Sequence, residues 1–338
     1  MKPPSSQEWA THVGSRVVVR IRDGQGLRDV LGELLAVDGR TLRVEGRRGP
    51  VEVPLSLVVA GKPVPPKARR AAPPHRALSV ADLELTMAKH WQADEQDWLG
   101  GWLLRASGGF TKRANSVLAV GEPGMPMDVA VMEVVDWYTE RGLRPVAAAP
   151  EPRLGDEDSA ALLAATAAFE AAGWQPVPDN STAVLTAPVA ELRNRPLPDG
   201  LTITLTDEPD PAWMRQYEYR GQAVPEHGIR LLSSAPHQVF ASVRTAAGEV
   251  VGMARGSGAE GWTGLTAMKV EPAWRRRGLA LALIAAIAEW GWQQRSLSMY
   301  LQVVESNTGA LATYAKAGFT FHHRYGYLRP VDQADQAD

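Results

Sequence analysis

Residues 263–290 read TGLTAMKVEPAWRRRGLALALIAAIAEW. A β-strand is predicted to end near Val270, where Pro272 stops it, and the apolar run from Leu279 predicts a helix with one buried side. A strand, a glycine-containing turn and a helix in direct succession point several backbone N–H groups and the positive end of the helix dipole at one place. The sequence therefore predicts an anion-binding site at the start of this helix.

The turn before the helix is basic and contains a glycine. Gly278 has no Cβ, so the backbone can approach a phosphate closely, and Ala280 keeps the next turn small. Arg275, Arg276 and Arg277 add positive charge. Since a helix N-terminus contributes about 0.3 to 1 kcal/mol per negative charge, a pyrophosphate would be bound by the sum of several amides rather than by one residue. Taken alone, the turn also fits a solvated basic loop that caps a buried helix.

A second motif follows downstream, where residues 301–319 read LQVVESNTGALATYAKAGF. Together the two stretches resemble the GNAT (N-acetyltransferase) family. The first is similar to its pyrophosphate loop, Q/R-x-x-G-x-G/A after a strand, and the second to its pattern N-x-x-A-x-x-x-Y-x-x-x-G-F. The resemblance implies acetyl-CoA as the cofactor and direct transfer of the acetyl group to an amine of a small molecule or a protein. It thus implies an N-acetyltransferase with no covalent enzyme intermediate.

The resemblance also implies residue roles. The positions that it assigns to cofactor binding are Met268, Val270, Arg275, Arg276, Arg277, Gly278, Leu279, Ala280 and Asn307. Tyr314 would protonate the departing thiolate, while its alternative role is that of a core aromatic residue at the helix end. Many GNAT enzymes carry a Glu where this chain has Gly264, so the base that deprotonates the amine is left unassigned. Glu305, His227 and Glu218 are candidates for it, and each also fits an ordinary polar residue.

Two parts of the chain resemble each other. FEAAGW at residues 169–174 matches YAKAGF at residues 314–319 in type, and in both a glycine is predicted to end a helix in a left-handed cap. We therefore expect two copies of one α/β fold with a mixed sheet, residues 78–192 and residues 201–330, with chance similarity of two helix ends as the alternative. The first copy lacks the basic loop and is expected to be degenerate, whereas the second would bind acetyl-CoA. The sequence around Asn307 is also similar to the active half of mycothiol synthase, a tandem GNAT protein.

The N-terminal part has a different pattern. Residues 1–60 contain short alternating runs separated by turn signals such as Asp23-Gly24 and Asp38-Gly39, which predict a small SH3-like β-barrel. Residues 61–77 read GKPVPPKARRAAPPHRA and lack acidic residues, so they predict an extended linker. Residues 331–338 are expected to form a tail.

Composition excludes several classes of protein. With 36 Lys and Arg against 38 Asp and Glu, the net charge is -2, and no global field favours a nucleic acid or a membrane. The chain has no cysteine, which excludes disulfides, thiolate nucleophiles and cysteine-based metal sites. No HExxH spacing occurs, so we expect no metal site. Neither a signal peptide nor a run of about 20 apolar residues is found, and a soluble cytoplasmic protein is predicted.

Four residues are candidates for contacting the amine acceptor, namely Glu218, Tyr219, Arg113 and Asn115. The first two lie where GNAT folds place acceptor-binding elements, and the other two either face a cleft between the copies or bridge their interface. The barrel is expected to dock a protein partner or to oligomerise rather than to bind nucleic acid, because its charges are mixed. A second class of function stays open: a non-catalytic protein that senses acetyl-CoA through the second copy and contacts a protein or nucleic acid through the barrel.

Overall fold

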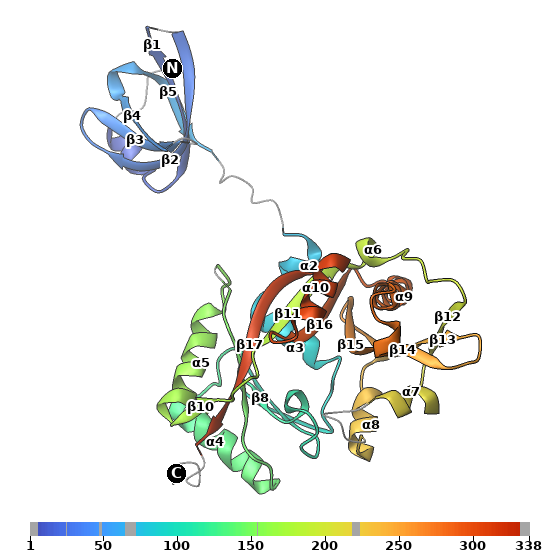
Figure 1. Cartoon of the computed structure of the whole chain (residues 1–338). Helices are drawn as coiled ribbons and strands as arrows, with labels where there is room; N and C mark the ends of the chain where they lie inside the picture. The colour runs from blue at the N-terminus through green and yellow to red at the C-terminus, as the bar shows by residue number, and fades with distance from the viewer. Residues whose placement is uncertain are drawn as a thin grey trace. The chain divides into compact units, whose positions relative to one another are not determined.

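The computed structural model describes residues 6–24, 26–46, 49–64, 72–153, 155–217 and 224–331 (Figure 1). The chain divides into two compact units, Met1–Ala71 and Ala72–Asp338. Strand β5 includes residues 61–63 and helix α2 begins at Pro74, both within the range expected to be a linker. In the described part of the chain, no helix combines the length and the apolar character needed to cross a bilayer.

The N-terminal unit is a five-stranded antiparallel sheet preceded by one short helix. Its elements are α1 Ser6–Ala10, β1 Arg16–Asp23, β2 Gly26–Val37, β3 Thr41–Gly46, β4 Gly49–Pro54, a 3-10 turn Leu55–Leu57 and β5 Val58–Pro63. Alternate residues of β1 are buried, as expected for a strand with one face on a core, and they pack with Trp9 of α1.

The strand order of this sheet is β4-β3-β2-β1-β5, and the outer strands β4 and β5 do not pair with each other in its described residues. The described hydrogen bonding is therefore open between β4 and β5. The 3-10 turn between these strands carries the chain across to β1, with which β5 pairs. The SH3-like β-barrel stays a prediction for this sheet.

The second unit has an α/β architecture, as predicted. Its first half, residues 72–199, contains α2 Pro74–Ala77, α3 Val80–Ala88, β6 Glu95–Leu99, β7 Trp102–Ala106, a 3-10 turn Lys112–Ala114, β8 Val117–Leu118, α4 Met127–Glu140, β9 Ala147–Pro150, α5 Ser159–Ala171, β10 Trp174–Pro176, β11 Thr182–Pro188 and α6 Val189–Leu192. Its second half, residues 200–331, contains β12 Leu201–Thr206, α7 Pro211–Gln216, α8 Glu226–Leu232, β13 His237–Thr245, β14 Val250–Ala259, β15 Trp262–Val270, a 3-10 turn Pro272–Trp274, α9 Leu279–Gln293, β16 Ser298–Val304, α10 Thr308–Ala317 and β17 Thr320–Pro330.

The two halves repeat one order of elements. The segment β8-α4-β9-α5-β10 of the first corresponds to β15-α9-β16-α10-β17 of the second, and the strands β8 and β9, like β15 and β16, pair in parallel. Both predicted caps are confirmed: Gly173 after α5 and Gly318 after α10 have φ of 84° and 115°. The aromatic residues that follow them, Trp174 and Phe319, are buried.

The halves exchange strands within one mixed sheet, whose order is β12-β13-β14-β15-β16-β11-β17-β9-β8-β7-β6. Strand β11 of the first half lies between β16 and β17 of the second. Strand β17 is long enough to pair with β11 through its first part and with β9 and β10 of the first half through its second part. Figure 1 shows β17 as a long strand that runs from beside β11 down to β10. Neither half therefore has a complete sheet of its own.

Candidate functional site

A cleft opens where strands β15 and β16 separate. Their described parallel pairing runs from Trp262 to Leu265 and goes no further. Just beyond, Ala267 has a φ of 53°, and the register of β15 against β14 shifts at this point, which marks a β-bulge. The bulge turns residues 268–270 away from β16, so that this edge of β15 faces the cleft instead of a neighbouring strand.

The cleft has a volume of about 700 Å³ and lies between the end of β15, the start of α9 and one side of α10. The residues with a predicted site role that line it are Met268, Val270, Arg275, Arg276, Gly278, Leu279, Ala280, Asn307 and Tyr314. Arg277 is not among the described lining residues, because its guanidinium lies over the ring of Trp274 at 4.9 Å. Two motifs that are separate in the sequence thus form one cavity wall.

The loop before α9 has the conformation of an anion-binding turn. Arg276 and Gly278 both adopt left-handed backbone angles, with φ of 60° and 87°. For Arg276 this conformation costs about 1 kcal/mol, which an unconstrained loop would avoid. Within the described residues no side chain caps the start of α9, and the residues of its first turn line the cleft. The free N–H groups of this turn are therefore available to an anionic ligand.

Tyr314 projects from α10 into the same cleft. Burial raises the pKa of the Tyr314 hydroxyl to about 12, so the group keeps its proton at neutral pH. The ring of Phe319 packs edge-on against it at 6.0 Å, which also gives Tyr314 the core contact considered in the alternative interpretation. The Asn307 side chain caps α10 by accepting a hydrogen bond from the Ala310 N–H at 3.1 Å. Asn307 also lines the cleft, so it could contact a ligand there.

Glu305 lies outside the described lining of the cleft. Its carboxylate forms an ion pair with Arg324 at 3.3 Å and accepts a hydrogen bond from the Ser181 hydroxyl. Both partners belong to the region of strand exchange, so these contacts hold Glu305 at the sheet.

The structure explains why no carboxylate occupies position 264. A Cβ atom on Gly264 would lie 2.6 Å from Ser257 Oγ and 2.7 Å from Tyr300 Oη, which leaves no room for a side chain. Ser257 Oγ is also 3.0 Å from Nδ1 of His90, a buried residue of the first half. Sequence reasoning missed Tyr300 and His90, because no local motif marks them.

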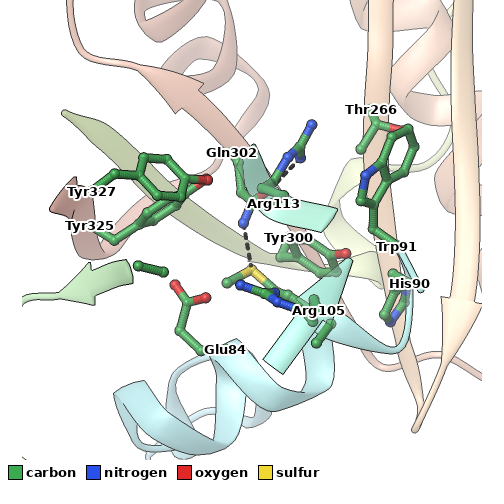
Figure 2. A pocket seen from close by; sticks show the side chains of 13 residues that line it. Glu84, His90, Trp91, Arg105, Arg113, Thr266, Tyr300, Gln302, Tyr325 and Tyr327 are labelled. Carbon is green, nitrogen blue, oxygen red and sulfur yellow. Dashed lines mark hydrogen bonds between the residues drawn. The ribbon is translucent and has the colours of Figure 1, made fainter. Parts of the chain in front are cut away.

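A second cavity lies between the two halves, behind the bulge (Figure 2). It has a volume of about 20 Å³ and is lined from the first half by Arg105 and Arg113 and from the second by Tyr300 and Gln302, among others. Arg113 Nη1 donates a hydrogen bond to Gln302 Oε1. This predicted residue therefore bridges the halves and faces a cavity at the same time.

The other acceptor candidates lie elsewhere. The Asn115 amide makes five hydrogen bonds to backbone groups of residues 107–111, which commits it to holding its own loop. Glu218 and Tyr219 lie outside the described residues. His227 packs its ring against Phe110 at 6.0 Å and does not line either cavity among their described residues.

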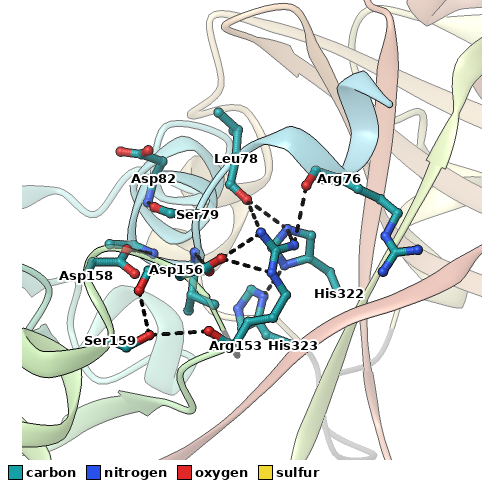
Figure 3. A network of polar contacts seen from close by, with 12 residues as sticks. Arg76, Leu78, Ser79, Asp82, Arg153, Asp156, Asp158, Ser159, His322 and His323 are labelled. Carbon is teal, nitrogen blue, oxygen red and sulfur yellow. Dashed lines mark hydrogen bonds and ion pairs between the residues drawn. The ribbon is translucent and has the colours of Figure 1, made fainter. Parts of the chain in front are cut away.

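A buried polar chain leads from the second cavity to the α5 side of the sheet (Figure 3). Arg153 donates to His322 Nε2 at 2.9 Å, the two histidine Nδ1 atoms are 2.8 Å apart, and His323 Nε2 is 2.8 Å from Glu84. Because a guanidinium only donates, His322 Nε2 accepts in its contact with Arg153, and the same nitrogen also lies 3.2 Å from the Leu78 carbonyl oxygen. On its other side, His323 can donate from Nε2 to the Glu84 carboxylate. Asp156 forms an ion pair with Arg153 at 2.9 Å.

We expect stability to fall as the pH drops below about 6.5, the ordinary histidine pKa. Burial lowers the pKa of His90 and of His322 to about 3, so between these values the unfolded chain binds more protons than the folded chain. Each group then contributes a slope of up to about 1.4 kcal/mol per pH unit. Urea unfolding at pH 7, 6, 5 and 4 measures this slope. The variant His322→Gln should flatten it and the exposed control His237→Gln should not; equal slopes for both would contradict the assignment.

The chain is similar to known proteins over most of its length. A family model described as "Probable histone acetyltransferase Rv0428c C-terminal" matches residues 79–328. The chain is 31% identical over 335 residues to the "Probable histone acetyltransferase Rv0428c" of Mycobacterium tuberculosis, covering 94% of this chain and 95% of that protein. It is 27% identical over 262 residues to the "Uncharacterized N-acetyltransferase YobR" of Bacillus subtilis, covering 74% and 99% respectively.

Among solved structures, a GCN5-related N-acetyltransferase from Kribbella flavida is similar with a TM-score of 0.55 at 17% sequence identity. The similarity covers 76% of this chain and 98% of that chain. At this sequence identity the similarity shows the fold alone.

Proposed function

The chain belongs to the GNAT N-acetyltransferases, in the family of the Rv0428c C-terminal region, and from this premise we propose that it transfers an acetyl group from acetyl-CoA to an amine. The observation that carries the proposal is the cleft, in which the uncapped start of α9, the free edge of β15 and the Tyr314 hydroxyl meet. These groups match a ligand with an anionic end, a hydrogen-bonding arm and a thiol leaving group.

In this proposal different groups of cleft residues bind different parts of acetyl-CoA. The N–H groups from Arg276 to Ala280 bind the pyrophosphate, and the edge from Met268 to Val270 pairs with the pantetheine arm as an added strand would. Asn307 hydrogen-bonds the same arm.

The reaction itself is a direct transfer. The amine nitrogen forms a bond to the thioester carbonyl carbon, the N–H near Met268 stabilises the charge on its oxygen, and the carbon–sulfur bond breaks. Tyr314 donates its proton to the departing sulfur, and the proton that the amine gives up returns to Tyr314 through solvent. We leave Glu305 out of the reaction, since its carboxylate is engaged by Arg324 and Ser181.

Replacing Gly278 by Glu is expected to weaken acetyl-CoA binding by about 10- to 100-fold. The new carboxylate repels the pyrophosphate, and a residue with a Cβ disfavours the left-handed turn by about 1 kcal/mol. Titration calorimetry of acetyl-CoA into both proteins measures the effect. The matched control is Gly124→Glu, because Gly124 also has a left-handed φ, of 76°, and open space around its Cβ position.

The outcomes separate the candidate functions. Loss of binding in Gly278→Glu alone supports the cofactor site, whereas absence of binding to the wild type would mean that the loop has lost its function. Binding without turnover of any amine would support the second candidate, an acetyl-CoA-sensing protein. A protein-docking role of the N-terminal sheet stays a prediction in either case.

A further inference from the structure

The second cavity carries more positive than negative charge. Arg105 and Arg113 line it, and Glu84 is the single carboxylate among the described lining residues. The Arg105 guanidinium donates to Ser116 O and Oγ, both at 3.0 Å. Arg113 donates a hydrogen bond to the neutral Gln302 amide. Arg105 is buried and Arg113 is half-buried. Guanidinium groups withdrawn from water without an anion are costly, so this excess of charge calls for an explanation.

A third arginine lies directly behind the cavity wall. Arg255 is fully buried, and it donates to Leu232 O at 2.6 Å, His90 O at 3.3 Å and Thr266 Oγ1 at 3.3 Å. The guanidinium carbons of Arg113 and Arg255 each lie 5.3 Å from the ring of Trp91. In the described part of the chain, none of the three arginines forms an ion pair with a carboxylate. An anion in the cavity would therefore relieve repulsion between like charges in a low-dielectric environment.

The Glu84 carboxylate is not the anion that balances the charge of the three arginines. Its carboxylate accepts the His323 Nε2 proton at 2.8 Å and is held at one wall by the chain that leads to Arg153. Figure 2 shows Glu84 on the side of Tyr325 and Tyr327, with His90 and Trp91 across the cavity. Burial raises the pKa of both tyrosine hydroxyls, so they remain neutral donors at physiological pH. Since the two hydroxyls also hydrogen-bond each other, the donors left for an anion are those of the Arg113 guanidinium.

The size and position of the cavity restrict its ligand. A volume of about 20 Å³ admits only a group of a few heavy atoms, so a larger ligand would have to extend out of the cavity. Thr266 lines this cavity and Met268 lines the cleft, with the bulge at Ala267 between them. For its amine to react, a molecule anchored in this cavity must extend past the bulge into the cleft.

We propose that the second cavity binds the carboxylate of the acceptor, and that the acceptor is a small amine of the amino acid type rather than a protein lysine. This inference rests on the proposed function. A carboxylate is small and planar, and it accepts paired hydrogen bonds from a guanidinium, which a point-like or neutral group does not. Arg113 is the residue that selects it, because it faces the cavity with donors beyond its bond to Gln302.

The test compares amines that differ only in a carboxylate. L-lysine is paired with cadaverine, L-phenylalanine with phenethylamine and L-tryptophan with tryptamine, and a lysine-containing peptide with blocked termini represents protein amines. Thiol release from acetyl-CoA measures kcat/KM, and calorimetry of the same amines without acetyl-CoA measures binding independently of transfer. In the wild type we expect at least one carboxylated amine to exceed its partner by about tenfold or more.

The variants locate this preference. Arg113→Met should abolish it with an unchanged Kd for acetyl-CoA, and Arg113→Lys, which keeps the charge, should retain part of it. The control Arg195→Met removes an exposed arginine and should change neither. Thermal unfolding shows whether each variant is folded.

Each other result overturns the inference. Equal use of paired amines, preference for the peptide, absence of binding by every carboxylated amine, or a preference that survives in Arg113→Met would each do so. If acetyl-CoA binds while the carboxylate preference is absent, the inference alone is wrong. If acetyl-CoA does not bind, the proposed function fails, and the calorimetric comparison of the amine pairs still decides whether the cavity selects carboxylates.

Discussion

Replacing Tyr314 by Phe is expected to lower kcat by about 10²- to 10⁴-fold, the range typical of a lost general acid. Burial raises the pKa of the Tyr314 hydroxyl to about 12, so it is protonated at neutral pH and can donate to the departing sulfur. The ring still packs against Phe319 after the change, and acetyl-CoA binding should be nearly unaffected. Stopped or continuous thiol-release assays with a saturating amine give kcat, and calorimetry gives the Kd.

The matched control is Tyr138→Phe. Burial raises the pKa of Tyr138 also to about 12, but this hydroxyl bonds the backbone of Arg105 in the first half, at 2.9 Å to its carbonyl oxygen and 3.2 Å to its nitrogen. Its removal should cost about 1 kcal/mol of stability and leave kcat close to the wild type. A Tyr314→Phe enzyme that keeps full kcat would assign this residue to packing alone, which is the alternative interpretation of the motif.

The part of the site that was predicted from the sequence is the part encoded by contiguous residues. The loop from Arg275 to Ala280 needs only a strand, a left-handed turn and a helix start, and each of these follows from local residue types. The cap at Gly318 is local for the same reason, and both appear in the structure as expected.

The second cavity could not be predicted in this way. Its walls come from both halves, and Tyr300 and His90 meet beside Gly264 only because the sheet brings distant segments together. The same limit explains Asn115, which was a candidate for contacting the acceptor although its amide holds a loop. The residue type of a position does not show which groups the fold brings against it.

The strand exchange is the largest feature of the fold that cannot be predicted from the sequence. The repeat of elements predicts two copies, and the simplest expectation is two separate domains. In the structure β11 pairs with β16 and β17, and β17 continues to β9 and β10. Pairing partners depend on which edges meet after folding, so a pattern of apolar residues that fits one strand neighbour fits another equally well.

Neither half of the second unit is expected to fold alone. A fragment of residues 200–338 lacks β11, whose Val184 and Leu185 are buried between two strands, and a fragment of residues 72–199 lacks β17 with its buried Leu328. Burying each such side chain contributes about 1.5 to 3 kcal/mol, and several are lost at once against a total stability of only about 5 to 15 kcal/mol. Circular dichroism and thermal unfolding of each fragment should show no cooperative transition.

Co-expression of the two fragments should restore a cooperative transition, because the exchanged strands then regain their partners. The control is residues 72–338, which omits the N-terminal sheet and keeps both halves, and which should unfold cooperatively because that sheet belongs to a separate compact unit. A second-half fragment that unfolds cooperatively by itself would show that the gap left by β11 can close. In that case β16 and β17 would have to pair directly, and the cleft beside β15 would exist without any contribution from the first half.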